Sequence, residues 1–370
     1  MKHYLIVALA AMVVTLVATP VVRRIAISVG AITAVRERDV HTTPTPRLGG
    51  VAIWLGLAIA VAVGSQIDYF NPIFAGISPW AIVLGSAVVC LLGAADDIWD
   101  LDWLTKLVGQ ALAAVLLAWQ GVQLFTLPIA GLVVAAPSTW LFISVLVILV
   151  AMNAVNFVDG LDGLAAGMIA ISATAFFVYT YLLAQSTNAA TYANNASFIL
   201  VALVGACLGF LPYNFHRASI FMGDSGSMVL GLVIAGAAIV VTGQIDPAQV
   251  DTAQTFPVFL PMLLPVVVLL LPLLDMGTAV VRRLSKGQSP FAADRMHLHH
   301  RLLQLGHSQR RAVLILYLWT ALFSFCAAAM AFWPLGKVGV VFLIGVVVAL
   351  VLTLGPLRKS SVRKIRDRAK

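Results

Sequence analysis

The sequence predicts an all-α protein that crosses a lipid bilayer many times, and three observations carry that prediction. Hydrophobic residues make up 61% of the 370 residues and charged residues only 10%, whereas soluble domains carry about 25% charged residues. The mean hydropathy is +1.00. Apolar runs of about 20 residues, enough to cross roughly 30 Å of hydrocarbon, recur along the whole chain. We therefore expect a single integral membrane domain over residues 1–370, with a basic tail at 357–370.

Eleven apolar runs, separated by polar breaks, predict about eleven transmembrane helices. They lie near residues 4–22, 49–64, 79–95, 105–120, 138–156, 163–184, 196–212, 226–242, 257–275, 312–333 and 338–356. We expect the ninth span to be bent or broken, because proline removes a backbone donor and this run contains Pro257, Pro261, Pro265 and Pro272. Between the fourth and fifth runs, the segment VQLFTLPIAGLVVAAPST is expected to form a small extracytoplasmic β-hairpin, since its apolar halves flank an Ala-Gly pair.

The distribution of basic residues predicts the orientation in the membrane. Of the 23 Lys and Arg residues, 21 fall on one side of the predicted spans, and only Lys2 and Lys337 fall on the other. Basic residues accumulate in cytoplasmic loops, so the N-terminus is expected outside and the C-terminus in the cytoplasm. The net charge of +8 then reflects topology signals and lipid headgroup contacts. The expected partner is the bilayer, and no nucleic acid partner is expected.

The first acidic motif is Asp96-Asp97, at the predicted cytoplasmic end of the third span. Two carboxylates about 4 Å apart repel each other by roughly 4 kcal/mol at an effective dielectric near 20. A divalent cation or a retained proton would offset that repulsion. For this fragment alone, a solvated end of a helix remains the alternative.

The second acidic motif is NAVNFVDGLDGLAAG, after the fifth span, with Asn156, Asp159 and Asp162. At the start of a helix the two carboxylates would share one face, because they are three residues apart. Gly160 and Gly163 would let the backbone approach a ligand closely. The alternatives are an ordinary turn and a loop like those that bind calcium.

The third acidic motif is FMGDSGS, which leads directly into the eighth span. It predicts that Asp224 is a metal ligand beside a phosphate site, since the free N–H groups at a helix N-terminus attract anions. A simple N-cap is the alternative, because aspartate is also favoured there.

Two basic loops on the same predicted face complete the pattern. One contains His297, His299, His300 and Arg301, and it indicates a cationic, hydrogen-bonding site for a diphosphate. A transition-metal site is less favoured because no cysteine accompanies these histidines. The other loop, RERDVHTTPTPRLGG, offers His41 and Arg47 as weaker candidates for contact with an anion.

Together, the motifs ADD, NxxNFxDGLDGLA, FMGDSGS and HLHHRL resemble those of the polyprenyl-phosphate N-acetylhexosamine-1-phosphate transferases, glycosyltransferase family 4, over nearly the whole chain. The resemblance implies transfer of a sugar-1-phosphate from a UDP-sugar to undecaprenyl or decaprenyl phosphate, with release of UMP. It also implies ten or eleven transmembrane helices, Mg²⁺ as cofactor with Mn²⁺ as a substitute, and a homodimer. The enzyme would lie in the bacterial cytoplasmic membrane with its active site facing the cytoplasm.

The resemblance also implies roles for individual residues. The catalytic residues would be Asp96, Asp97, Asp159, Asp162, His297, His299 and His300. The substrate-binding residues would be Asn156, Asn214, Phe221, Arg301, Lys106, His41 and Arg47. The metal ligands would be Asp224 and Asp97.

The histidine motif bears on the choice of donor. Leu298 interrupts the histidines, and Arg301 stands where the branch that transfers phospho-MurNAc-pentapeptide has an aromatic residue. The segment KGQSPFAADRMHLHHRL instead resembles the branch that uses UDP-GlcNAc to begin O-antigen, common antigen, teichoic acid or arabinogalactan linkers. The phospho-MurNAc-pentapeptide transferase remains the alternative. A secondary transporter, the alternative from another class, is disfavoured because transporter sites lie near the membrane midplane and these carboxylates gather on one face.

Overall fold

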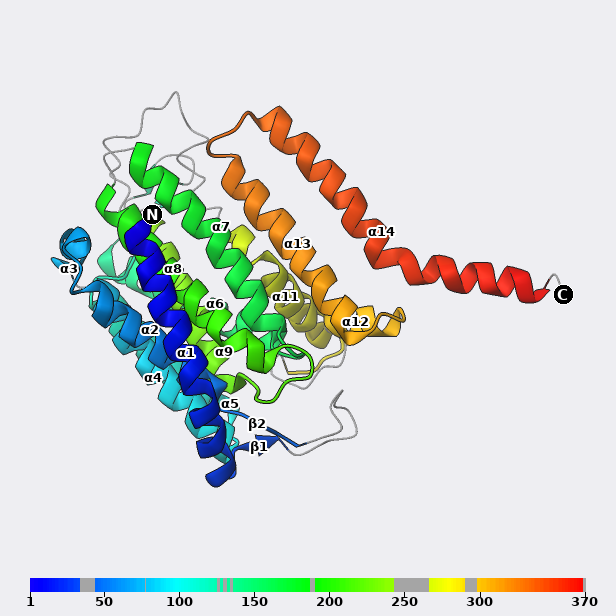
Figure 1. The fold of residues 1–370 in the computed structure, drawn as a ribbon, viewed down its shortest axis with the longest axis horizontal. Helices are drawn as coiled ribbons and strands as arrows, with labels where there is room; N and C mark the ends of the chain where they lie inside the picture. The colour runs from blue at the N-terminus through cyan, green and yellow to red at the C-terminus, as the bar shows by residue number, and fades with distance from the viewer. Residues whose placement is uncertain are drawn as a thin grey trace.

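The computed structural model describes residues 1–33, 44–76, 78–124, 127–128, 132–133, 136–186, 190–242, 266–289 and 298–368. Within these ranges the protein is a bundle of long helices (Figure 1). The helices are α1 (Lys2–Ser28), α2 (Gly49–Gly64), α3 (Asn71–Phe74), α4 (Ser78–Trp99), α5 (Trp103–Trp119), α6 (Pro137–Val158), α7 (Leu164–Ser186), α8 (Ala190–Asn214), α9 (Gly223–Thr242), α11 (Leu270–Ser285), α12 (Leu298–Gln304), α13 (Gln309–Ala329) and α14 (Leu335–Arg368), with a 3₁₀ turn at Asp68–Phe70.

Two short antiparallel hairpins accompany the helices. Strand β1 (Ile32–Thr33) pairs with β2 (Thr45–Pro46), and β3 (Leu127–Pro128) pairs with β4 (Leu132–Val133). The second pair confirms a hairpin between the fourth and fifth predicted spans, whereas its extracytoplasmic side stays a prediction.

The helices confirm the predicted fold class, an all-α polytopic membrane protein. Ten of the eleven predicted spans coincide with a helix, and α2 has the predicted bounds. Among the described residues, eight helices are long and apolar enough to cross a membrane, or nine if α2 and the segment 68–74 form one span bent by 94°. The span count of eleven stays a prediction, because α5 is a shorter apolar helix and most of the ninth run lies outside the described residues. That run's Pro257, Pro261 and Pro265 lie there too, so its predicted break also stays a prediction.

Helix α9 lies at the centre of the bundle. In the apolar stretch of α9 every residue is buried, whereas only 11% of the corresponding stretch of α14 is buried. Helices α2, α4, α6 and α8 pack around α9, and α14 lies at one edge of the bundle beside α13 (Figure 1). Large apolar side chains face outward, with Trp119 82% and Leu91 72% exposed, as a surface in contact with lipid requires.

Glycines let α2 and α4 contact the start of α9 backbone to backbone. A Cβ on Gly50 would lie 2.0 Å from the backbone nitrogen of Gly226, and a Cβ on Gly93 would lie 2.3 Å from that of Ser225. Small residues allow such close approach between helices in membranes. The N-terminus of α9 is therefore fixed between two neighbouring helices, and this position sets the geometry of the acidic motifs.

Candidate active site

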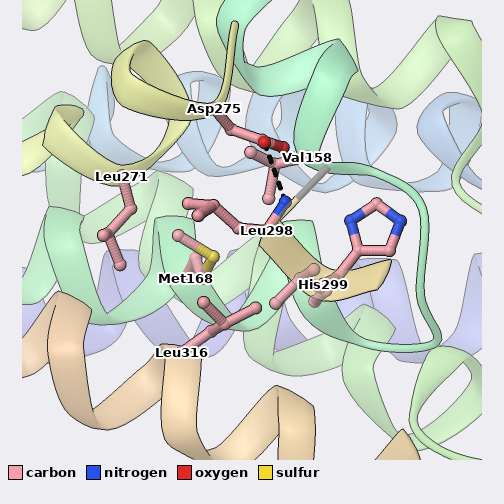
Figure 2. A pocket seen from close by; sticks show the side chains of 8 residues that line it. Val158, Met168, Leu271, Asp275, Leu298, His299 and Leu316 are labelled. Atoms are coloured by element: carbon pink, nitrogen blue, oxygen red, sulfur yellow. Dashed lines mark hydrogen bonds between the residues drawn. The ribbon is translucent and has the colours of Figure 1, made fainter. Parts of the chain in front are cut away.

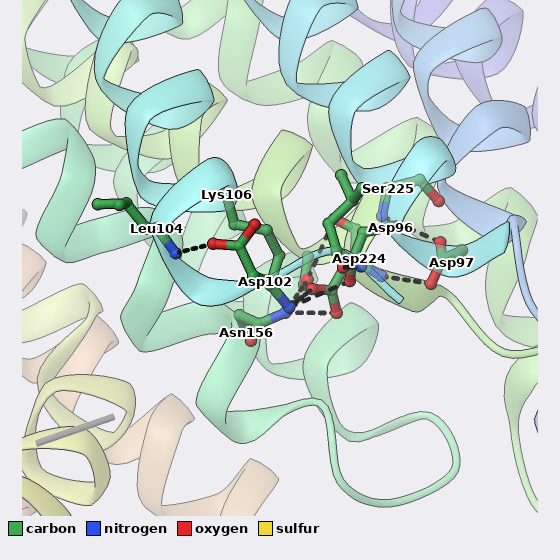
Figure 3. A network of polar contacts seen from close by, with 10 residues as sticks. Asp96, Asp97, Asp102, Leu104, Lys106, Asn156, Asp224 and Ser225 are labelled. Atoms are coloured by element: carbon green, nitrogen blue, oxygen red, sulfur yellow. Dashed lines mark hydrogen bonds and ion pairs between the residues drawn. The ribbon is translucent and has the colours of Figure 1, made fainter. Parts of the chain in front are cut away.

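Three carboxylates from two helices converge at the motif end of the bundle. Asp96 and Asp97 lie in the last turn of α4 and are 6% and 8% exposed, and Asp224 lies in the first turn of α9. Figure 3 shows them side by side with Lys106 and Asn156. We call these five residues the carboxylate cluster. The alternative of a solvated helix end is wrong for Asp96 and Asp97, because packing of α4 on α9 buries both.

Asp224 is held from two sides by side chains of other helices. The Lys106 Nζ on α5 lies 3.3 Å from Asp224 Oδ2 and 3.1 Å from Asp96 Oδ2. Asn156 Nδ2, near the end of α6, donates to Asp224 Oδ1 at 2.9 Å and to Ser227 Oγ at 2.9 Å. The structure thus brings the predicted residues Lys106 and Asn156 into direct contact with Asp224.

Asp97 acts as a cap for α9 although it belongs to α4. Its Oδ1 accepts the backbone N–H of Asp224 at 3.0 Å, and its Oδ2 accepts that of Ser225 at 3.2 Å. Gly223 has φ +72°, and a Cβ there would lie 2.3 Å from Asp97 Oδ2. These two N–H groups were expected to face a phosphate. That expectation is wrong for this pair, because the Asp97 carboxylate already satisfies both. Metal ligation by Asp97 stays a prediction.

Asp159 and Asp162 lie in the turn between α6 and α7 and not at a helix start. They therefore do not share a helix face, because the helix is interrupted at Asp159 and resumes only after Gly163, which has φ +75°. Asp162 is 3% exposed. Its Oδ2 accepts the N–H of Ala218 at 3.1 Å and lies 3.4 Å from His216 Nδ1. Asp162 thus fixes the segment that leads into α9.

Asp159 is half-buried at the edge of the carboxylate cluster. Burial raises the pKa of its carboxyl group to about 7, and the charges of Asp224 and Asp97 add to the rise, while Arg47 opposes it. The predicted residue Arg47 is therefore close enough to act on the acidic site electrostatically.

Two predicted substrate contacts have internal partners. The backbone of Phe221 donates to the Pro46 carbonyl at 2.8 Å and accepts from Gly49 at 3.0 Å. Asn214 is 3% exposed, accepts the N–H of Gly163 through Oδ1 at 3.1 Å and donates to the Ile220 carbonyl at 3.0 Å. These bonds join the segments before α2, α7 and α9. Substrate contact by Asn214 and Phe221 stays a prediction.

The histidines of α12 lie against the Asp-Gly turn. His299 is 3% exposed, and a Cβ on Gly160 would lie 2.5 Å from its ring. The His300 ring lies 4.3 Å from that of His299, and Arg301 is exposed. We call His299–Arg301 the histidine segment. The other two predicted histidines, His297 and His41, lie outside the described residues.

Comparison with known proteins identifies the family. Residues 79–242 match the model of glycosyl transferase family 4. The decaprenyl-phosphate N-acetylglucosaminephosphotransferase of Mycolicibacterium smegmatis is 43% identical over 362 residues, which cover 96% of this chain and 89% of that protein. The chain belongs to glycosyl transferase family 4.

Two further family members are similar over less of the chain. A probable undecaprenyl-phosphate N-acetylglucosaminyl 1-phosphate transferase of Bacillus subtilis is 30% identical, covering 84% of this chain and 80% of that protein. A phospho-N-acetylmuramoyl-pentapeptide-transferase of Desulforudis audaxviator is 33% identical, but the match covers only 56% of this chain and 66% of that protein.

The carboxylate cluster of this family member has a donor set that fits Mg²⁺. Mg²⁺ prefers oxygen ligands and is usually held by one or two carboxylates plus substrate phosphates. Asp96 and Asp224 already share one cation, the Lys106 ammonium, through one oxygen each. Among the described residues, no group of three His, Cys, Asp or Glu side chains is arranged to hold a metal alone.

Sequence reasoning missed Asp275. It lies on α11 and is 2% exposed, and its Oδ1 accepts the backbone N–H of Leu298 at 2.9 Å (Figure 2). A carboxylate inside an apolar run is costly in a membrane and marks a functional position by default. That signal was available in the ninth predicted run, where Asp275 is the only acidic residue.

Proposed function

We propose that this protein transfers GlcNAc-1-phosphate from UDP-GlcNAc to decaprenyl or undecaprenyl phosphate, giving polyprenyl-diphosphate-GlcNAc and UMP. The observation that carries the proposal is the 43% identity, over 96% of the chain, to a decaprenyl-phosphate N-acetylglucosaminephosphotransferase. The convergence of Asp96 and Asp224 with Lys106 and Asn156 supports it, because phosphoryl transfer mainly requires positioning and neutralisation of charge. Membership of an enzyme family also favours this activity over transport.

In this proposal each charged residue has a distinct task. Mg²⁺, held by Asp224 together with Asp97 or Asp96, would neutralise charge on the diphosphate of the donor. The positive charge of Lys106 reduces the repulsion between the carboxylates of Asp96 and Asp224. Arg47 and the histidine segment supply positive charge and N–H donors for phosphate oxygens.

Asp159 is the carboxyl group best suited to keep the acceptor phosphate deprotonated. A base works best when its pKa is near the working pH, and burial raises the pKa of Asp159 to about 7. The two oxygens of Asp97 already accept backbone N–H groups. Asp96 already accepts from Leu101 and Lys106. The assignment of this role to Asp96 or Asp97 is the alternative.

The activity is tested with purified protein and a panel of donors and acceptors. UDP-GlcNAc should give labelled lipid and UMP with Mg²⁺, less with Mn²⁺ as substitute, and none with chelator. UDP-MurNAc-pentapeptide should give no labelled lipid. Buried polar groups that lack a hydrogen-bond partner on the wrong donor discriminate strongly against it. Labelled lipid from the pentapeptide donor alone would replace the proposed donor. The match to the Desulforudis audaxviator protein keeps this second candidate open, although it covers little more than half of the chain.

We further propose that the active site faces the cytoplasm of a bacterial cell, across its cytoplasmic membrane. The distribution of basic residues supports this orientation, and a cytosolic nucleotide sugar requires it. A cysteine in place of exposed Ser289 should react with an impermeant reagent only after permeabilisation. A cysteine in place of exposed Gln66, at the other end of the bundle, should react in intact cells. The reverse pattern would invert the topology.

A homodimer is part of the same proposal. The apolar outward face of α14 is available for contact with lipid or a second copy, since only 11% of its apolar window is buried. The mass of the protein in nanodiscs distinguishes the two states, and a single copy per disc with full activity would remove the dimer from the proposal.

A further inference from the structure

A buried carboxylate outside the carboxylate cluster contacts the residue of α12 that directly precedes the histidine segment. Asp275 lies on α11, and its Oδ1 accepts the backbone N–H of Leu298, the first residue of α12, at 2.9 Å. The carboxylate is 2% exposed, and burying it would be costly without hydrogen-bond partners. In Figure 2 its oxygens point at the Leu298 nitrogen. The bond satisfies one of the N–H groups that a helix start leaves unpaired.

The first turn of α12 packs at the junction of four longer helices, α6, α7, α11 and α13. Leu298 and His299 line a small pocket between these helices. Its apolar walls come from Val158, Leu164, Met168, Leu271 and Leu316. Apolar contacts are not directional, whereas the hydrogen bond to Asp275 is, and it orients the start of the turn.

The position of this turn decides where His299 lies. Its ring is 3% exposed and lies against Gly160, where a Cβ would come within 2.5 Å of ring atoms Cε1 and Nε2. Gly160 directly follows Asp159 in the turn between α6 and α7. A shift of α12 would therefore change the distance between the imidazole and this acidic turn.

We propose that Asp275 is a positioning residue for the transfer reaction. Its carboxylate holds the first turn of α12, so that His299 stays against the turn that carries Asp159. Asp275 acts through His299 and touches neither donor nor acceptor. The proposal rests on the proposed function for its kinetic test, and its structural test is independent of activity.

The kinetic test compares two variants that differ in one acceptor oxygen. Asp275→Leu removes the acceptor and should lower kcat by about tenfold or more, since small misplacements near reacting groups cost up to about a hundredfold. Asp275→Asn keeps an acceptor oxygen and should stay within about threefold of wild type. Equal losses in both would overturn the proposal. Ser144→Ala is the matched control. Ser144 is fully buried and also accepts a backbone N–H, that of Leu124 at 2.8 Å, but it does not belong to the active site.

A double-mutant cycle separates positioning from a general structural role. If Asp275 acts through His299, then adding Asp275→Leu to His299→Ala should lower kcat no further. Two losses that multiply would overturn the proposal, since the two residues would then act independently.

Cross-linking tests the geometry without any turnover. In a chain whose Cys90, Cys207 and Cys326 are replaced by alanine, the pair Gly160→Cys and His299→Cys should be joined by a short bifunctional thiol reagent. Adding Asp275→Leu should abolish that cross-link, and adding Asp275→Asn should preserve it. No cross-link in the first pair, or an unchanged one with Asp275→Leu, would overturn the proposal. Failure of GlcNAc transfer with the cross-links as expected would instead count against the proposed function.

Discussion

The carboxylate cluster and the histidine segment are built in different ways. The cluster sits at the ends of long helices, where glycines bring backbones into contact and each carboxylate has at least two polar partners. The histidine segment sits on a helix of seven residues whose start is held by Asp275 and by apolar contacts. A rigid scaffold positions charges more accurately than a short connecting segment. We therefore expect the cluster to be fixed before substrate binds, and the histidine segment to depend on the packing of its short helix.

The largest effect is expected for Asp224→Asn, which removes charge from the centre of the cluster. Losing a group that stabilises charge in the transition state typically costs roughly a hundredfold or more in rate. The variant should keep the wild-type unfolding temperature in detergent, because the amide preserves the shape of the side chain. Asp102→Asn is the matched control, since Asp102 caps α5 nearby and asparagine caps equally well. An Asp224→Asn variant within a few-fold of wild type would remove Asp224 from the metal site.

A second prediction concerns the close packing that fixes the cluster. Gly93→Ala would place a Cβ 2.3 Å from the backbone nitrogen of Ser225, and no side-chain movement can relieve a clash with backbone. Overpacking of this kind costs about 1–3 kcal/mol or more, so both the unfolding temperature and kcat should fall. Gly85→Ala, on the same helix, would meet nothing closer than Leu117 Cβ at 3.5 Å and should be tolerated. Equal behaviour of the two variants would mean that α4 and α9 are not locked together.

A third, smaller effect is expected for Lys106→Gln. This change removes the cation shared by Asp96 and Asp224 while keeping a polar side chain. Lys106 is partly exposed, so solvent and added cations screen the loss, and we expect kcat to fall by about tenfold. Lys286→Gln is the control, because exposed Lys286 lies on the same predicted face at the end of α11. Full activity of Lys106→Gln would show that the cluster needs no internal cation.

The same contrast explains how much the sequence could predict. Runs of apolar residues predicted the bounds of α2 and the placement of Asp224 at a helix start, because these properties are local. The role of Asp97 was not predictable from local pattern. It caps a helix that begins more than 120 residues later in the chain, and only the packing of α4 on α9 creates that contact.

Asn214 and Asp162 show the same limit at a smaller scale. Both belong to motifs that the sequence singled out, and both use their polar atoms to fix neighbouring segments. Residue type and spacing indicated that chemistry occurs near them. Which polar atoms face substrate and which hold the loops depends on pairings across 50 residues or more, and these appear only in the folded chain.

The smallest effect is expected for Gly160→Ala, which tests the histidine segment directly. The new Cβ would lie 2.5 Å from the His299 ring, so the ring must move away, and the end of a side chain on a short helix can do so more easily than a backbone can. We expect kcat to fall by about three- to fivefold, with an unchanged unfolding temperature, because misplacement near the reacting groups lowers rate without loss of core packing. Gly277→Ala on α11 is the control, since a Cβ there meets no atom within 4 Å. In a His299→Ala background, Gly160→Ala should have no further effect. A loss as large as that of Asp224→Asn would mean that the histidine segment is held as rigidly as the carboxylate cluster, and the contrast between the two regions would not hold.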